Sequence, residues 1–321
     1  MKKFCRAVFI SVTMAVVAAS AAVAQTFTKP IHVIVPYPAG DLADTIARLL
    51  APSLLETLGQ PIVVDNKPGA SGLLGLQSAL QGANDGHTFL VGQMGSMAVA
   101  PISNKQPFDV RAEFVPVAMA YTNYLMLVAN PGLPAKTFPQ LVAYSKANPG
   151  KVRLATNGEG GFPHLAMEHL KELTGFDFIH VPYKGSGQPL TDTIGGQVDM
   201  TVAGFSTLYP HVQSGRLVAV GLTGKSRTPN APNIPTIGES VSGYEALGWF
   251  GFFARKDTPP AAIAAFNTAV NAALQKSDVA QKSQGFGLDT VSGPPSLLGS
   301  IWQGDYDKWG KLLRTLKLDA K

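Results

Sequence analysis

Cysteine is almost absent from this chain of 321 residues, and its single copy, Cys5, lies before an apolar run near the N-terminus. No disulfide can form within the chain, and the residues after the run offer neither a cysteine nucleophile nor thiolate metal ligands. Hydrophobic residues make up 45% of the composition and charged residues only 15%, which is typical of a folded chain held together by its core.

Sequence signatures of catalysis are also missing. The chain contains no G-x-S-x-G and no H-E-x-x-H, so a hydrolase would need an unmarked serine or threonine as its nucleophile. The six histidines show no metal-ligand spacing, and solvated or capping histidines are the simpler interpretation. A sequence close to a phosphate-binding loop ends at Gly224-Lys225-Ser226, but Ala219 stands in place of its first glycine. Lysine and arginine do not cluster with aromatic residues, so we expect no nucleic-acid partner and no cofactor.

One long apolar run is present, from Ala7 to about Ala19, between three basic residues and Ala22-Val23-Ala24. This pattern predicts a secretory signal peptide over residues 1–24, with cleavage near Ala24. A membrane anchor is the alternative, which is disfavoured because the run is shorter than the ~20 residues that span a bilayer. Cleavage would remove three basic residues and no acidic one, so the formal net charge would fall from +5 to +2.

The stretch from Ile31 to Arg48 shows a unit that the rest of the chain repeats. Residues 31–35 are mostly β-branched and predict a strand that is buried on both faces of a parallel sheet. Two prolines and Gly40 then force a turn, and Asp41 can cap the following helix, with Asp44 in the position of a capping box. The helix N-terminus would face the carboxyl end of the strand, where α/β proteins bind anions. An ordinary strand-to-helix turn is the alternative.

Two later turns are similar to this one. The segment Gly92 to Met97 is a loop of mostly small residues after a predicted strand, and Thr156 to His164 contains three glycines and places Pro163 in the first turn of a helix. The turn from Thr156 to His164 is the second lobe's counterpart of the turn before Asp41. If these two turns face each other across a cleft, their backbone amides could hold the two ends of a small anion.

Alternating strand and helix patterns predict an α/β chain of two lobes, which the length also favours. We expect a discontinuous first lobe of residues 25–124 plus 246–321, a second lobe of residues 125–245, and a cleft between them. The predicted strands are 31–35, 61–65, 88–91, 124–129, 152–156, 177–181, 198–203, 217–223 and 246–254. The predicted helices after the first are 73–80, 138–147, 163–173, one within 185–194, 259–275 and 297–316.

Six short motifs are distributed along the chain after residue 24: Val35-Pro36-Tyr37-Pro38-Ala39-Gly40, Leu58-Gly59-Gln60-Pro61, Asn66-Lys67-Pro68-Gly69-Ala70, Val181-Pro182-Tyr183-Lys184-Gly185, Gly195-Gly196-Gln197-Val198-Asp199 and Trp249-Phe250-Gly251. In this combination the chain resembles the Bug-type (TctC-like) periplasmic solute receptors of tripartite tricarboxylate transporters. The resemblance implies a two-lobed type II periplasmic binding protein in which each lobe is a doubly wound sheet flanked by helices. It also implies a monomeric, non-enzymatic receptor in the periplasm, which closes on a small organic acid and delivers it to a membrane permease of one large and one small subunit.

The resemblance further implies that the turn at Tyr37 to Asp41 holds a carboxylate through backbone amides and water, while the loop from Thr156 to His164 adds contacts from the other lobe. The residues that we expect to bind ligand are Tyr37, Ala39, Gly40, Asp41, Met94, Gly95, Ser96, Thr156, Asn157, Gly160, Gly161, Phe162, His164, Gly204 and Phe205.

This chain departs from the family pattern at three places. Asp41 stands where a glycine is usual, Gly161 and Phe162 stand where small hydroxyl residues are usual, and Ala203 stands where an aspartate is usual. We therefore expect Phe162 to favour ligands with a flat or apolar body and Asp41 to disfavour plain dicarboxylates. Two other functions stay open at this point, a receptor that presents its ligand to a membrane sensor and, less favoured, a secreted hydrolase.

Overall fold

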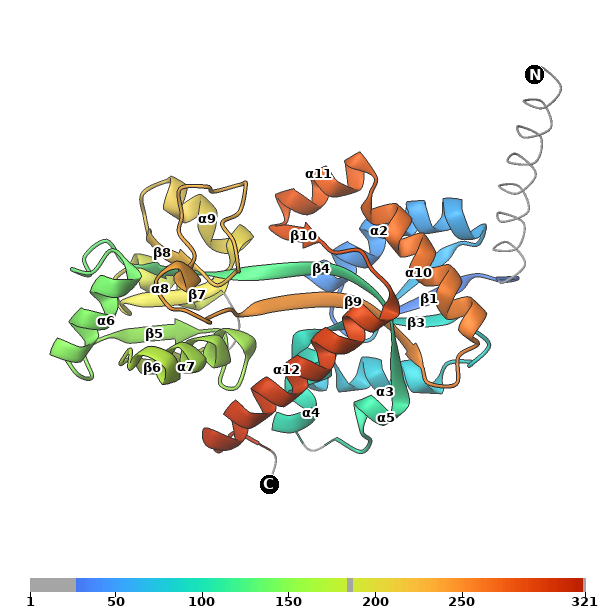
Figure 1. The fold of residues 1–321 in the computed structure, drawn as a ribbon, viewed down its shortest axis with the longest axis horizontal. Coiled ribbons are helices and arrows are strands. Elements are labelled where there is room, and N and C mark those ends of the chain that lie inside the picture. Colours follow the sequence, from blue (N-terminus) through green and yellow to red (C-terminus); the bar gives the residue numbers. More distant parts are fainter. Residues whose placement is uncertain (1–26, 105, 184–186, 320–321) are drawn as a thin grey trace, which may run out of the picture.

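The computed structural model describes residues 27–319 apart from residues 105 and 184–186, so the predicted signal peptide lies outside the described residues. Two lobes lie side by side along the long axis of the molecule, and two strands, β4 (Phe114–Ala129) and β9 (Leu247–Arg255), lie along the connection between them (Figure 1). Within the described part, no helix is long and apolar enough to cross a membrane.

The first lobe is built on a sheet with the strand order β2-β1-β3-β9-β4. Strand β1 pairs in parallel with β2 and β3, while β9 is antiparallel to both β3 and β4. Its elements are β1 (Ile31–Val35), α2 (Leu42–Leu58), β2 (Ile62–Asn66), η1 (Ala70–Gly72), α3 (Leu73–Gln81), β3 (Thr88–Gln93), the short π-helix η2 (Gly95–Val99), α4 (Ala100–Ser103), α5 (Val110–Glu113), α10 (Pro260–Leu274), α11 (Ser277–Gly285), β10 (Leu288–Thr290) and α12 (Pro295–Thr315).

The second lobe is built on the last part of β4, which pairs with β7 on one side and with β8 on the other. Strand β7 continues the sheet through β5 to β6 in parallel pairing. Its elements are α6 (Phe138–Ala147), β5 (Arg153–Thr156), α7 (Phe162–Thr174), β6 (Ile179–Pro182), α8 (Gly187–Ile194), β7 (Met200–Gly204), α9 (Phe205–Gln213), β8 (Val218–Leu222) and η3 (Ile237–Glu239).

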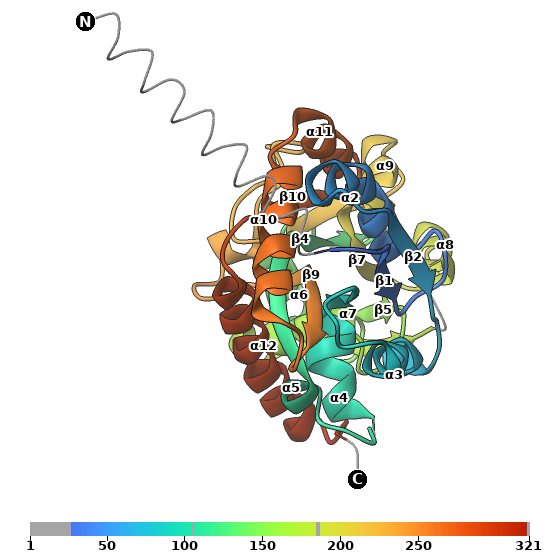
Figure 2. The same cartoon turned by 90° about the vertical axis from the view of Figure 1, so that its right-hand side faces the viewer.

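Strand β1 shows why the first sheet is covered on both faces. Ile31, Val33 and Val35 belong to a buried cluster with α2 and α10, whereas Ile34 belongs to another cluster with α3. Seen from the end of the molecule, α2 and α10 lie on one side of this sheet and α3 lies on the other (Figure 2). A strand in this position is mostly apolar, as the sequence predicts, and only His32 of β1 is exposed.

The turn after β1 forms because Gly40 adopts a positive φ of 85° and Asp41 is extended. The Asp41 carboxylate accepts a hydrogen bond from the Ala43 amide at 2.9 Å, so the predicted helix cap is confirmed. The predicted capping box with Asp44 is wrong. The Asp44 carboxylate instead accepts from the amide of Gly40, one residue before the cap, at 2.9 Å.

Strand β4 is much longer than the sequence predicts, because it begins at Phe114 instead of Tyr124. Pro116 removes a backbone donor and argues against a strand, but the pairing with β9 shifts register between Pro116 and Ala118 and so accommodates it. The short elements η1, η2, α4, α5, α9, η3, α11 and β10 were not predicted from the sequence either.

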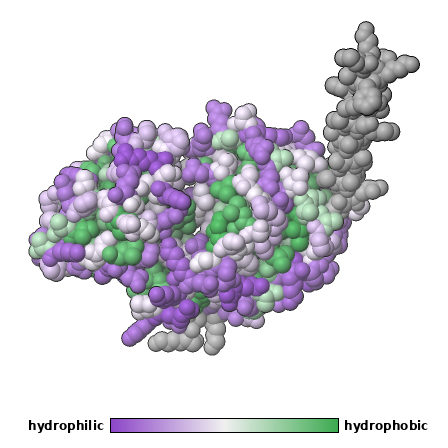
Figure 3. Space-filling view, in the orientation of Figure 1, coloured by the Kyte–Doolittle hydropathy of each residue, from purple (hydrophilic) through white to green (hydrophobic). Residues whose placement is uncertain are grey.

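The chain crosses between the lobes at two adjacent points. In β4, Asn123 pairs with Gly248 and Tyr124 with Leu247 in the first sheet, and the next residue, Leu125, pairs with Gly204 of the second sheet. The space-filling view shows polar and apolar residues mixed over both lobes, with a notch between them (Figure 3). The two-lobed α/β architecture is as predicted, while the exact lobe boundaries stay a prediction.

Candidate ligand-binding site

A cavity of about 290 Å³ lies between the lobes, where both crossing strands meet the ends of β3 and β7. Its polar side chains belong to Gln93, Asn123, Asn157 and Thr207, and no ionisable side chain lines it. The complete lining consists of Gln93, Met94, Gly95, Asn123, Leu125, Asn157, Phe162, Pro163, Ala203, Gly204, Thr207, Gly248, Trp249 and Phe250. A ligand in this cavity would contact residues of both lobes.

Aromatic residues form one wall, and α12 fixes their positions. The indole Nε1 of Trp249 donates to an Asp305 carboxylate oxygen at 2.7 Å, and Nε1 of Trp309 donates to the other oxygen at 3.1 Å. The ring of Phe162 meets Trp309 edge to face at 5.9 Å between centroids. Trp249 is buried and bound to Asp305, so it supports this wall from within the core, while Phe162 is only partly buried.

Two helices of the second lobe begin at the cavity. Helix α7 starts at Phe162 after Gly161, helix α9 starts at Phe205 after Gly204, and neither glycine provides a side-chain cap. The first amides of both helices therefore lack the side-chain partner that Asp41 gives to α2, and the positive ends of both helix dipoles lie at the cavity. This arrangement favours an anionic group without any buried cation.

The structure places five of the predicted ligand-binding residues in the lining, namely Met94, Gly95, Asn157, Phe162 and Gly204. Ser96 lies just behind it, with its hydroxyl between the backbone N–H and C=O of Gln93. Phe205 is buried and stacks on Tyr209 at 4.6 Å. The remaining predicted residues lie outside the lining, in the turn at Tyr37 to Asp41 and at the other positions of the turn from Thr156 to His164.

The turn before α7 is held by two stacked imidazoles. The rings of His164 and His180 lie 3.7 Å apart and almost parallel. The Gly160 amide donates to Nδ1 of His164 at 3.0 Å, and the Thr156 hydroxyl is 2.7 Å from Nε2 of His180. Burial and the neighbouring His164 lower the pKa of His180 to about 4, against the opposing charge of Glu168. Thr156, Gly160 and His164 thus shape the turn rather than the cavity surface.

The turn at Tyr37 to Asp41 does not reach the cavity lining. Burial raises the pKa of the Tyr37 hydroxyl, against hydrogen bonds with Gln93 and Ser96 that would lower it. Partial burial, opposed by the hydrogen bond from Ala43 and reinforced by the Asp44 charge, raises the pKa of Asp41. The amides of Gly40 and Ala43 are already bound to Asp44 and Asp41. This turn is thus largely satisfied by its own side chains.

Sequence analysis missed nine lining residues: Gln93, Asn123, Leu125, Pro163, Ala203, Thr207, Gly248, Trp249 and Phe250. One signal was available, because Thr122 and Asn123 form a polar pair inside an otherwise apolar strand. Such an interruption at the point where a strand changes sheets indicates a surface that faces a cavity.

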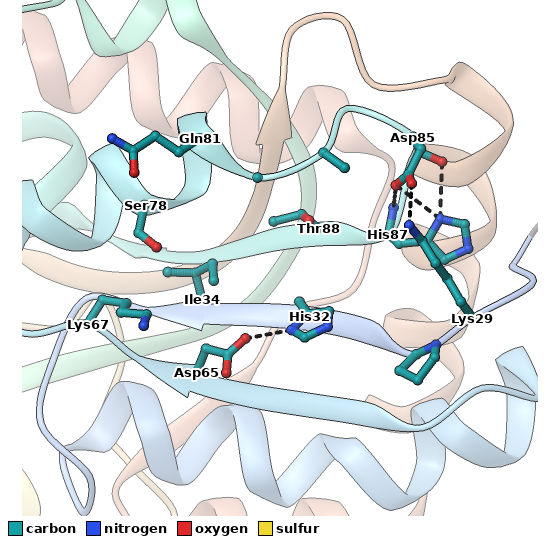
Figure 4. Close-up of a pocket in the computed structure, with 13 residues that line it drawn as sticks. Lys29, His32, Ile34, Asp65, Lys67, Ser78, Gln81, Asp85, His87 and Thr88 are labelled. Atoms are coloured by element: carbon teal, nitrogen blue, oxygen red, sulfur yellow. Dashed lines mark hydrogen bonds and ion pairs between the residues drawn. The ribbon is translucent and has the colours of Figure 1, made fainter.

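A second hollow of about 520 Å³ lies on the outer part of the first lobe, between α3 and strands β1 to β3 (Figure 4). It shares no residue with the interlobe cavity, and several of its charges are paired within it, as Lys29 with Asp85 at 2.6 Å and His32 with Asp65 at 2.6 Å. The hydrogen bond from Lys29 is the main cause that lowers the pKa of Asp85 to about 2. Across the described residues, no group of three His, Cys, Asp or Glu side chains could hold a metal ion.

Two doubly wound lobes that are joined by two strands, with a cavity between them, define a two-lobed solute-binding protein of the periplasmic type. The family model described as tripartite tricarboxylate transporter family receptor (TctC) matches residues 46–318. The chain therefore belongs to this family of receptors, as the resemblance implied.

Known proteins agree with this assignment. Protein BugT of Bordetella pertussis is 33% identical over 89% of this chain and 89% of its own length. A solved R. palustris protein with adipate is 29% identical, covers 90% of this chain and 97% of its own, and superposes with a TM-score of 0.77. MatC from Rhodopseudomonas palustris with bound malate is 28% identical, with coverages of 89% and 99% and a TM-score of 0.72.

Proposed function

We propose that this receptor is exported to the periplasm, binds one small organic acid in the interlobe cavity and delivers it, as a monomer, to a membrane permease of one large and one small subunit. The observation that carries the proposal is the convergence of two uncapped helix N-termini, those of α7 and α9, on a cavity between two lobes. Such a site attracts a carboxylate by amides and dipoles. The related proteins solved with adipate and with malate support an acid as the ligand class.

The lining narrows the kind of acid. The partly exposed ring of Phe162 offers aromatic surface, which suits a ligand with a flat or apolar body. Ala203 supplies no charge at the position where the family usually has an aspartate, and no other lining residue is ionisable. We therefore propose a carboxylate, or a related aromatic or amide-bearing compound, that carries no more than one full charge inside the cavity. Thr207 is the only hydroxyl side chain in the lining, and no histidine lies there to activate it, so the proposal contains no catalytic step.

A thermal-shift screen tests this function. The mature protein is heated with mono- and dicarboxylates, aromatic acids, amides and amino acids, because a ligand that binds only the folded state raises the melting temperature by mass action. At a concentration one hundred times Kd we expect a rise of about 4 °C for a chain of this size. If no organic acid at millimolar concentration shifts the melting temperature, the proposed ligand class is wrong.

Export is tested separately by mass spectrometry of the periplasmic protein. We expect an N-terminus near Gln25, because Ala22-Val23-Ala24 matches a signal-peptidase site. A periplasmic chain that retains residues 1–24 would contradict cleavage without affecting the assignment of the cavity.

A further inference from the structure

Asn123 occupies the point where β4 passes from one lobe to the other. It pairs with Gly248 in the first sheet, and two residues later β4 pairs with β7 of the second sheet. Its side chain is half-buried and lines the interlobe cavity. Because Asn123 lies where the two lobes meet, a ligand bound to either lobe within the cavity lies close to it.

The neighbouring strand leaves room for this amide. A Cβ atom at Gly248 would lie 2.2 Å from Oδ1 of Asn123 and 3.3 Å from Cε1 of Phe162. The Asn123 amide therefore rests on the backbone of Gly248, near the edge of the Phe162 ring. Only glycine at position 248 permits this arrangement, since real Cβ contacts are never that short.

Within the described residues, the half-buried Asn123 side chain makes no hydrogen bond to the protein. In the part of the chain that the structure describes, each other buried or half-buried asparagine makes at least one side-chain hydrogen bond: Asn66, Asn130, Asn148, Asn267 and Asn271. None of the side-chain hydrogen bonds among the described residues involves Asn123. The Asn123 amide atoms are not among the fully buried polar atoms without a partner, so the amide is open to the cavity and its donors and acceptor are available to whatever fills it.

Resting on the proposed function, we propose that Asn123 recognises a neutral group with both a donor and an acceptor, such as a carboxamide, that the ligand carries in addition to its carboxylate. A side-chain amide offers one acceptor oxygen and two donor hydrogens, which a carboxamide complements on both sides. A second carboxylate would meet only the donors and would bring its charge against the acceptor oxygen. No cation in the lining offsets that cost. A site that pairs with a polar group discriminates strongly against analogues that lack it.

Calorimetric titration of the mature protein with five acids tests this assignment. The probes are benzoate, 4-carbamoylbenzoate and terephthalate, which share one ring, and succinamate and succinate, which share one chain. For wild type we expect at least one carbamoyl acid to bind about tenfold tighter than the diacid of the same skeleton. Asn123→Leu should lose that tenfold preference while benzoate binding stays within twofold, because benzoate lacks the distal group. Asn123→Asp should lose the tenfold preference too. This substitution is almost isosteric, so its loss of preference cannot be attributed to misfolding.

The matched control is Asn233→Leu, an exposed asparagine outside the cavity, which should behave as wild type. The assignment of Asn123 is overturned if both Asn123 variants keep the wild-type preference, if wild type favours the diacids, or if none of the five probes binds although other acids in the thermal-shift screen do. If no acid of any kind binds to wild type, the proposed function fails as well, so the two failures are distinguishable.

Discussion

Asp41 and Asp44 lie three residues apart, yet the fold gives them different electrostatic environments. Asp44 is buried; burial alone would raise the pKa of its carboxyl, but hydrogen bonds from Arg48, Gly40 and Asn66 and the Arg48 charge lower it. Asp41 has one amide partner and, among the described residues, no cation in contact, and its pKa is raised. Asp44 therefore stabilises the turn as an anion, whereas the Asp41 charge is free to act on its surroundings.

Asp41→Asn separates the two roles of Asp41, because asparagine is as good a helix cap as aspartate but carries no charge. We expect an unchanged melting temperature and about fivefold tighter binding of plain dicarboxylates, since a like charge outside the lining still repels an anion through space at a cost on the order of 1 kcal/mol. Calorimetry at low and high salt measures this, with Asp109→Asn at the cap of α5 as the control. An unchanged dicarboxylate affinity would leave Asp41 as a helix cap alone.

Phe162 contacts both the cavity and Trp309, so its substitution tests ligand shape. In Phe162→Ser we expect the preference for aromatic over aliphatic acids to fall three- to tenfold, which corresponds to the ~0.5–1.5 kcal/mol of an aromatic contact. Competition binding with benzoate and butyrate gives the ratio. Phe286→Ser, at an exposed phenylalanine outside the cavity, is the control. A ratio equal to that of wild type would show that Phe162 has no part in selecting the ligand.

Among single residues, sequence could predict those whose role is local. Asp41 as a cap and Pro163 in the first turn of α7 follow from their position next to a helix start. Asn123, Trp249 and Phe250 enter the cavity only because β4 and β9 pair across more than one hundred residues of sequence. No local sequence pattern shows how β4 and β9 are aligned. The lining residues on turns could therefore be proposed from the sequence, whereas those on the strands could not.

At the scale of elements, the turn before α7 depends on a neutral His180. His180 stacks on His164, which accepts the Gly160 amide through Nδ1, and Glu168 lies 3.6 Å from Nε2 of His164. A proton on His180 would bring a positive charge into a partly buried stack, which is why its pKa falls to about 4. The shape of this turn, and with it the start of α7, is therefore sensitive to acid.

The pH dependence of stability follows from this shift. Because the folded pKa of His180 lies below the unfolded value, the unfolded chain binds the proton first, and stability falls as pH drops from about 6.5 towards 4. For a half-exposed ring we expect a loss on the order of 1 kcal/mol between pH 7 and pH 5 after allowance for solvent screening. Melting curves of wild type and His180→Gln give the comparison. The variant should lose about 1–2 °C less over this range, and equal losses would contradict the assignment.

Most long elements could be predicted from sequence, and the misses have physical causes. Helix α6 and the strands β1 and β3 show clear periodicity or buried β-branched runs between turn residues. The first half of β4 was hidden by Pro116, which a register shift accommodates. Strand β10 has three residues and exists only through its pairing with β4, so it carries no signal of its own.

At the scale of the whole molecule, the lobes share buried structure beneath the cavity. One apolar cluster contains Phe253 and Trp302 of the first lobe together with Leu165 and Met200 of the second. Helix α12 also contacts α7 through Trp309 and Phe162. We predict that the lobes close by rotation about the crossing points at Tyr124 and Leu247. Alternating βα patterns could predict the two lobes, but not how their cores join.

The central claim is that an acid binds between the lobes and draws them together, and small-angle X-ray scattering of the mature protein with and without a saturating acid tests it most directly. The acid is the one that raises the melting temperature most in the thermal-shift screen. We predict a smaller radius of gyration in its presence, because hinged closure brings the two centres of mass together. An acid that raises the melting temperature but leaves the scattering curve unchanged would contradict the account, since it would bind without closing the cavity.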